Sequence, residues 1–174
     1  MKILIREIKK GDGEGIIRCF NEALKRGLNT YTRSNTLSTP EDIKEFDKAF
    51  SKPRLNEFGF VAVDKGKNLI AGVCIFSSKG HERIRHIGEI SWGVHPDYLR
   101  KGIATKLADA TIREATRRKF VRIEADIAKN NTASVRLARK CGFRIEGIKK
   151  YGLLLDDGRY ENTYMFSKIL TKHK

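Results

Sequence analysis

The segment HPDYLRKGIA, residues 95–104, leaves a β-rich run and enters a run with helical periodicity. Gly102 and Ala104 are small enough to let the backbone approach a ligand closely, and the first-turn amides of a helix have no partner within that helix. The helix dipole favours an anion at this end, and Arg100 and Lys101 add formal positive charge. The segment therefore predicts a phosphate-binding turn, although a glycine-containing helix start without a ligand would show the same residues.

Outward from this turn, apolar periodicity and capping residues predict an order of elements: strand, two helices, three strands, helix, strand, helix and two strands. Thr39 and Pro40 mark the start of the second helix, and Gly142 stands where the last helix should stop. Gly27 is expected to close the first helix, with a loop over 28–38. The predicted strands are 3–8, 58–63, 69–76, 87–94, 121–127, 143–150 and 160–169; the helices follow Gly11-Asp12, start at Pro40, and span 103–118 and 132–141.

The length of 174 residues suits one domain, and a hydrophobic share of 40% with a charged share of 33% is typical of a globular protein. The apolar runs fall far short of the roughly 20 residues that span a bilayer. Residues 1–10 lack the features of a secretory signal, so we expect a cytoplasmic protein with no membrane association. The three cysteines form no C-x-x-C pair, which predicts reduced, mostly buried thiols and no metal site. Residues 1–174 are expected to form a single domain.

The net charge of +15, from 36 basic and 21 acidic residues, is expected to attract phosphate-rich partners. Coenzyme A, ribosomal RNA and nucleic acid in general all fit such a field. The basic residues are spread along the chain, so an ordinary solvated surface is the simpler interpretation. The charge alone therefore does not identify a partner.

A second motif begins 29 residues after Gly102, where NTAS at 131–134 opens the last predicted helix, and CGF at 141–143 follows that helix. Leu99 to Ala104 matches a loop of the form Q/R-x-x-G-x-G/A. In this order and spacing the two motifs resemble those of the GNAT superfamily of acetyltransferases, and the resemblance runs from about Ile3 to Leu170.

The resemblance implies an α/β fold whose mixed, mostly antiparallel sheet is flanked by helices and splays open at a central parallel strand pair. The pair would be the strand that ends at Val94 and the strand that starts at Val121, with acetyl-CoA as cosubstrate in the opening. One residue departs from the family pattern. Leu99 stands where the family often has Arg or Gln, so a side-chain contact with phosphate from this position is lost.

The resemblance also implies catalytic roles. Glu89 stands where many relatives have a glutamate that accepts a proton from the attacking amine, directly or through water. The alternative is that Glu89 is only a surface or salt-bridged glutamate. Ser134 would protonate the leaving thiolate, because Ala138 replaces the tyrosine common in relatives. Helix capping together with Asn131 is the alternative for Ser134. Other candidate donors are the tyrosines of the last two strands, Tyr151, Tyr160 and Tyr164.

The expected cofactor contacts lie on the same turn and on the last helix. The Val94 N–H would stabilise the negative charge that develops on the acetyl oxygen. Asn131 would hold the pantetheine arm. The residues expected around the acetyl group and the pyrophosphate are Val94, Leu99, Arg100, Lys101, Gly102, Ile103 and Ala104.

The resemblance implies that the acceptor is a primary amine, and an amine attacks a thioester only in its neutral form. At pH 7 an α-amine costs roughly 1.4 kcal/mol to deprotonate, against roughly 4.6 kcal/mol for a lysine. Within the superfamily, the end of the chain resembles two branches, the ribosomal-protein N-terminal acetyltransferases and the small amino-acid N-acyltransferases. The residues that carry this resemblance are Glu146-Gly147 and Asp157-Gly158-Arg159-Tyr160. The acceptor is therefore expected to be the α-amine of a protein N-terminus or of a small amino-acid-like molecule.

Other functions remain open at this stage. A non-catalytic coenzyme A sensor, or a module that docks on RNA or ribosomes, fits the positive charge and the missing tyrosine. Covalent transfer through Cys141 with a histidine base is a further alternative, although Cys141 before Gly142 fits a packing role. His95, next to the turn, has two options: helping the active site or stabilising the turn before Pro96. The sequence leaves ribosome association and a homodimer undecided.

Overall fold

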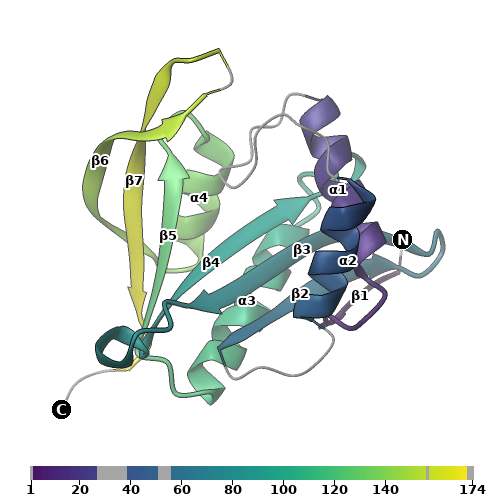
Figure 1. The fold of residues 1–174 in the computed structure, drawn as a ribbon, viewed down its shortest axis with the longest axis horizontal. Coiled ribbons are helices and arrows are strands. Elements are labelled where there is room, and N and C mark those ends of the chain that lie inside the picture. Colours follow the sequence, from purple (N-terminus) through teal and green to yellow (C-terminus); the bar gives the residue numbers. More distant parts are fainter. Residues whose placement is uncertain (1, 27–38, 51–55, 156, 172–174) are drawn as a thin grey trace.

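The computed structural model describes residues 2–26, 39–50, 56–155 and 157–171, and forms a seven-stranded sheet with helices on both faces (Figure 1). The strand order is β1-β2-β3-β4-β5-β7-β6. The strands are β1 (Ile3–Glu7), β2 (Glu57–Asp64), β3 (Leu69–Ser78), β4 (Ile87–Val94), β5 (Arg122–Ala128), β6 (Arg144–Leu154) and β7 (Tyr160–Ile169). The helices are α1 (Gly13–Lys25), α2 (Pro40–Ala49), α3 (Ile103–Arg117) and α4 (Thr132–Lys140), with 3-10 turns η1 (Glu82–Ile84) and η2 (Pro96–Tyr98). No helix within these ranges combines the length and apolar content that a membrane span needs.

The parallel strands β4 and β5 meet at the centre of the sheet. Ile87–Glu89 of β4 pairs with Arg122–Glu124 of β5, and every other pair of neighbouring strands is antiparallel. Beyond Glu89, β4 continues to Val94 and diverges from β5 (Figure 1). The mixed, mostly antiparallel sheet that splays at a central parallel pair is thus confirmed.

Side chains of β4 alternate between two faces of the sheet. Gly93 faces α1, because a Cβ added there would lie 2.7 Å from the ring of Phe20. Gly72, the register partner of Val94 on β3, faces α3, because its added Cβ would lie 3.1 Å from the side chain of Leu107. Odd-numbered residues of β4 therefore face α1, and even-numbered residues face α3.

An aromatic cluster fixes the closed end of the β4–β5 pair. Phe76 stacks on Phe58 with 4.7 Å between ring centroids and meets Phe120 edge-on at 4.6 Å. A Cβ at Gly88 would lie 1.9 Å from Phe76 Cζ, so only glycine lets β4 pass this ring. The three rings are buried with residues of α3, which places the main core beneath the point where the strands separate.

The helix ends follow the predicted signals. Thr39 caps α2 in a capping box with Asp42, as the sequence indicates. Gly142 follows α4 with a left-handed φ of +84°, which suits a helix stop. The two predictions for Gly27 and for the loop 28–38 fall outside the described residues.

The sixth strand is longer than predicted. The sequence ends it at Lys150, but β6 continues to Leu154 through a bulge. Tyr151 has a left-handed φ of +54°, and its N–H donates to Asn162 Oδ1 over 2.9 Å. This bond to a side chain takes the place of a backbone hydrogen bond between the strands. The bulge follows no periodic pattern, so the sequence does not predict it.

Two threonines are fully buried, at 0% exposure, but differ in hydrogen bonding. Thr111 Oγ1 donates to Leu107 O over 3.0 Å, within α3. Thr163 Oγ1 on β7 has no hydrogen-bond partner among the described residues. Both hydroxyls lose their hydrogen bonds to water on folding, but only that of Thr111 gains a protein hydrogen bond in return.

We therefore expect Thr163→Val to raise the free energy of unfolding by about 1 kcal/mol, because valine removes the unpaired hydroxyl at nearly constant shape. Thr111→Val is the matched control and should lower the free energy of unfolding by up to about 1 kcal/mol. Urea denaturation of the three proteins measures both effects. Equal destabilisation by the two substitutions would contradict the expectation.

Candidate active site

The opening between β4 and β5 is lined by backbone groups that the sheet does not pair. Odd-numbered residues of β4 direct their N–H groups toward β3, a pattern that His95 continues by donating to Ala71 O over 3.0 Å. Even-numbered residues therefore direct their N–H and C=O groups toward β5. Since the register with β5 ends at Glu89, the N–H groups of Trp92 and Val94 point into the opening.

The β5 wall of the opening shows the same arrangement. Lys129, just after β5, donates its N–H to Asn162 O over 3.0 Å, so odd-numbered positions bond toward β7. Even-numbered residues of β5, including Asp126, direct their backbone groups toward β4, although the Ala128 carbonyl already accepts a hydrogen bond of 3.0 Å from the Asn131 N–H. A ligand with amide groups can therefore form hydrogen bonds to both walls.

The turn after β4 is anchored by buried polar groups. His95 is buried, and its Nδ1 accepts a hydrogen bond of 3.3 Å from the Asp97 N–H. Tyr98 is also buried, and its hydroxyl donates to Asp64 Oδ2 over 2.8 Å. His95 thus stabilises the turn, the structural role that the sequence leaves as one of two options. The Tyr98 bond ties the turn to the end of β2.

The predicted phosphate turn presents backbone amides rather than side chains. Arg100 and Gly102 have left-handed φ angles of +59° and +73°, and Gly102, as the N-cap of α3, has no side chain with which to cap the helix. Ile103 is 3% exposed and faces the core, so only its N–H is available. Leu99 is 43% exposed beside the turn. A backbone of this kind at a helix N-terminus has the free amides and the dipole that suit an anion.

Lys101 is held against the turn itself. Its Nζ donates to Asp97 O over 2.8 Å and lies 5.0 Å from the centroid of the Tyr98 ring. The ammonium therefore adds positive charge to the turn from a fixed position. Ala104, in the first turn of α3, contributes an amide that has no helical partner.

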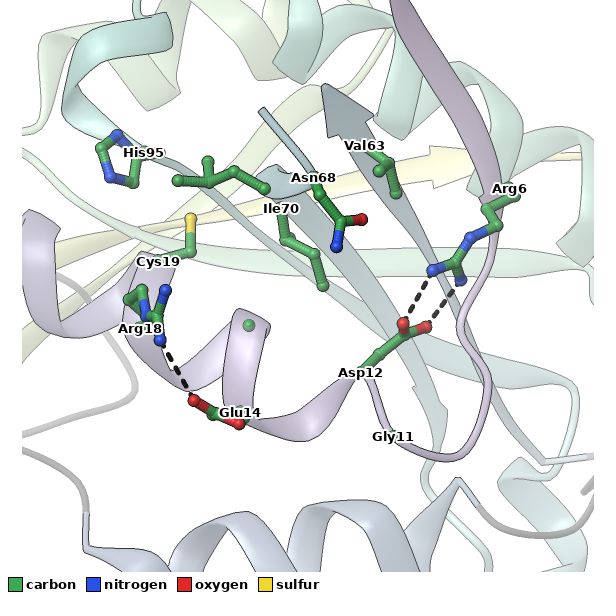
Figure 2. A pocket seen from close by; sticks show the side chains of 12 residues that line it. Arg6, Gly11, Asp12, Glu14, Arg18, Cys19, Val63, Asn68, Ile70 and His95 are labelled. Atoms are coloured by element: carbon green, nitrogen blue, oxygen red, sulfur yellow. Dashed lines mark hydrogen bonds and ion pairs between the residues drawn. The ribbon is translucent and has the colours of Figure 1, made fainter. Parts of the chain in front are cut away.

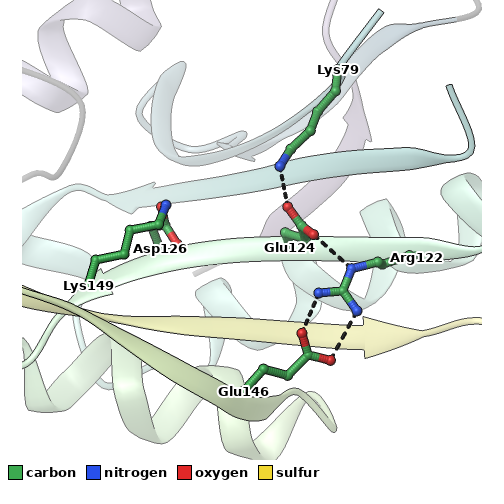
Figure 3. Close-up of polar contacts among 6 residues, drawn as sticks. All are labelled: Lys79, Arg122, Glu124, Asp126, Glu146 and Lys149. Carbon is green, nitrogen blue, oxygen red and sulfur yellow. Dashed lines mark hydrogen bonds and ion pairs between the residues drawn. The ribbon is translucent and has the colours of Figure 1, made fainter. Parts of the chain in front are cut away.

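Ion pairs cross the sheet at the closed end of the opening (Figure 3). Glu124 forms an ion pair with Lys79 and accepts a hydrogen bond of 2.7 Å from Arg122 Nε. Arg122 Nη1 also donates to Glu146 Oε1 over 3.0 Å, and this contact is the main reason that the pKa of Glu146 falls to about 2. The network joins β5 to β6 and to the segment that follows β3.

Glu89 lies on the same face as this network but makes no ion pair with a described residue. Burial raises its pKa above the ordinary glutamate value, and the negative charge of Asp126 raises it further. Lys79 and Lys149 act in the opposite direction, but both ammonium groups are already paired with carboxylates. Glu89 is therefore the carboxylate of this face that is best suited to exchange a proton.

The first turn of α4 closes the opening on the opposite face. Asn131 Oδ1 accepts a hydrogen bond of 3.1 Å from the Ser134 N–H, so Asn131 is the helix cap. Ser134 Oγ accepts a hydrogen bond of 3.2 Å from Trp92 Nε1. Ala138 is 0% exposed on the same face of α4. The sequence did not single out Trp92, although its even position on β4 places it on this face.

The thiols do not favour covalent chemistry. Burial raises the pKa of Cys141 and raises that of Cys19 to about 12, so neither thiolate is favoured at neutral pH. All three cysteines are free and buried, as predicted. His95 and Cys19 both line the cavity beside α1, whereas Cys141 does not line it.

A cavity of about 280 Å³ lies between α1 and the β2–β3 hairpin (Figure 2). Arg6 and Asp12 form two hydrogen bonds of 2.6 and 2.7 Å across it, and Arg18 donates to Glu14 over 3.1 Å. The charged groups of this cavity are thus paired with one another. Apart from His95, its walls come from β1, the loop before α1, α1 itself and the hairpin. None of the predicted site residues lines it, so we place the candidate site in the β4–β5 opening.

Comparisons with known proteins identify the family and the fold. A family described as an acetyltransferase (GNAT) domain matches residues 2–144. A ribosomal-protein-alanine N-acetyltransferase from Brucella melitensis is 26% identical, with a TM-score of 0.83 over 95% of this chain and 99% of that chain. A phosphinothricin acetyltransferase from Sinorhizobium meliloti, solved with acetyl-CoA, is 24% identical, with a TM-score of 0.83 over 100% and 94%.

An N-acetyltransferase from Staphylococcus aureus is 23% identical, with a TM-score of 0.86 over 98% of this chain and 100% of that chain. No curated protein sequence matches significantly. The family match covers most of the chain, and the sheet, its splay and the turn after β4 all agree with it. The chain therefore belongs to the GNAT family of acetyltransferases.

Proposed function

We propose that this chain transfers the acetyl group of acetyl-CoA to an α-amine, either of a protein N-terminus or of a small amino-acid-like molecule. The observation behind the proposal is the β4–β5 opening, which has the uncapped N-terminus of α3 at its open end and the carboxylate of Glu89 at its closed end. One end suits a phosphate-bearing donor and the other suits an amine. Residues 1–174 would act as a single acetyltransferase domain.

The backbone of the turn from Leu99 to Ala104 supports the placement of the donor. A Cβ on Gly102 would meet nothing within 4 Å, so the space beside it is available to a pyrophosphate. The unpaired backbone groups of β4 and β5 suit the amides of a pantetheine arm, and the side-chain NH₂ of Asn131 would bind the same arm. The relative from Sinorhizobium meliloti, solved with acetyl-CoA, supports the same donor.

Glu89 would act as the general base, directly or through one water. An α-ammonium must lose a proton before its nitrogen can attack the acetyl carbon, and a carboxylate with a raised pKa is a better proton acceptor than an ordinary one. The Val94 N–H, which points into the opening, would donate to the acetyl oxygen as it gains negative charge. Ser134 would donate to the sulfur as the C–S bond breaks.

The acceptor class can be identified by measuring thiol release from acetyl-CoA with free amino acids and with N-terminal peptides. Turnover with either set would support acetyl transfer and identify the acceptor. Tight binding of acetyl-CoA without turnover on any amine would instead support the coenzyme A sensor.

The donor site can be tested with Gly102→Glu, which should abolish acetyl-CoA binding because the new carboxylate occupies the phosphate site. Gly158→Glu is the matched control, since Gly158 also has a positive φ, +81°, and free space around it, but lies in the β6–β7 turn. Calorimetric titration measures the affinity, and circular dichroism checks the fold. Unchanged affinity in Gly102→Glu would refute the assignment of this turn.

The base can be tested with Glu89→Gln, which should lower turnover by about 100-fold with little change in acetyl-CoA affinity. Glu124→Gln, at the register partner of Glu89, is the control and should keep turnover within about threefold, because that carboxylate is held in ion pairs. Steady-state kinetics measures both variants. Full activity in Glu89→Gln would reduce Glu89 to a structural charge.

The pH profile gives a second test. Activity should fall as the pH drops through the raised pKa of Glu89, because only the carboxylate accepts a proton. Asp126→Asn removes a negative charge that raises the pKa of Glu89. It also releases Lys149 from its ion pair, and the positive charge of Lys149 lowers the same pKa. The acidic limb of the pH profile should therefore move to lower pH. A limb that stays in place or moves to higher pH would show that Glu89 does not control it.

A further inference from the structure

Trp92 joins the two sides of the opening on the face opposite Glu89. Its side chain leaves β4 toward α4, and the indole Nε1–H donates to Ser134 Oγ over 3.2 Å. The same ring meets Phe143 edge-on, with 6.5 Å between centroids. Trp92 thereby contacts the first turn of α4 and the residue that follows its C-terminal stop.

Chemistry fixes the direction of the Trp92–Ser134 hydrogen bond. An indole N–H donates and cannot accept, so Ser134 Oγ must be the acceptor. The Ser134 N–H is used separately, in its bond to Asn131 Oδ1. The hydroxyl proton takes part in neither contact and is directed away from the indole nitrogen.

We infer that Trp92 is a positioning residue that orients the Ser134 hydroxyl toward the leaving sulfur, an inference that rests on the proposed function. Donation into Oγ selects one rotamer of the serine and polarises its O–H bond, which makes it a stronger donor. Ala138 lies one turn after Ser134 on the same face, and Trp92 packs on the cluster that contains it.

The proton balance of the step explains why orientation matters. The C–S bond breaks and its electron pair stays on sulfur, which leaves as a thiolate. The proton lost by the amine goes to Glu89, the Ser134 hydroxyl stabilises the thiolate by a hydrogen bond, and solvent protonates the thiolate after release. A serine hydroxyl is a weaker acid than a thiol, so it cannot release its proton outright. It acts by a short, well-directed hydrogen bond, which requires that the hydroxyl be held in place.

The inference predicts that Trp92→Phe lowers kcat by about tenfold and changes the KM for acetyl-CoA by less than about twofold, because the ring remains but the N–H donor is lost. Ser134→Ala should lower kcat at least as much. If Trp92 acts through Ser134, the double variant will be no slower than Ser134→Ala alone. Phe143→Leu is the packing control, which should lower the melting temperature without the loss in kcat.

The outcomes separate the inference from the proposed function. Independent, multiplying effects of the two substitutions, or normal kcat in Trp92→Phe, would overturn the positioning role while acetyl transfer by the wild-type protein stands. A wild-type protein that releases no thiol with any amine would overturn the proposed function itself.

Fluorescence tests the hydrogen bond without turnover. Trp92 is the single tryptophan of the chain, so all indole emission reports on this site. Ser134→Ala removes the acceptor and should shift the emission of the ligand-free protein to shorter wavelength. An unchanged spectrum would mean that the bond does not form in solution, and the inference would fall.

Discussion

The short parallel contact between β4 and β5 is the constraint on which the rest of the structure depends. Three register pairs hold the strands together, and the packing of Phe76 against Gly88 fixes where this contact lies. Beyond this contact, β4 stays paired with β3 and β5 stays paired with β7, but β4 and β5 no longer pair with each other. Backbone donors and acceptors that a continuous sheet would consume are thereby left for a ligand. The opening is thus a consequence of strand divergence and needs no dedicated binding side chain.

Local charge at the opening differs from that of the whole protein. The chain has a net charge of +15, yet the face around Glu89 is rich in carboxylates, each of the others being held by a basic side chain. Paired charges of this kind contribute little to folding stability but fix the relative positions of β5 and β6. The same pairing keeps Lys79 and Lys149 from neutralising Glu89. A positively charged protein can therefore offer an amine a favourable local environment.

Features set by short-range sequence were the most predictable. The course of β4, the turn over 95–104 and the ends of α4 follow from alternation, capping and glycine, all of which act within a few residues. The bond between Trp92 and Ser134 could not be predicted, because it joins positions 42 residues apart and depends on which face of β4 meets α4. The ion pairs had a visible signal in the alternate charges of β5, but their partners come from other strands. The roles of Glu89, Ser134, Asn131 and Val94 remain predictions.

The alternation of β4 has one more consequence. Odd positions of this strand face α1, where the proposed acceptor would lie, whereas even positions face α3 and α4, where the donor would lie. Substitutions at neighbouring positions therefore alter opposite faces of one strand, with little coupling through side chains. Under the proposed function, substitutions at odd positions other than Glu89 would change the amine that is accepted, while the even positions would keep the acyl donor. The pleat of one strand would then separate acceptor recognition from donor binding.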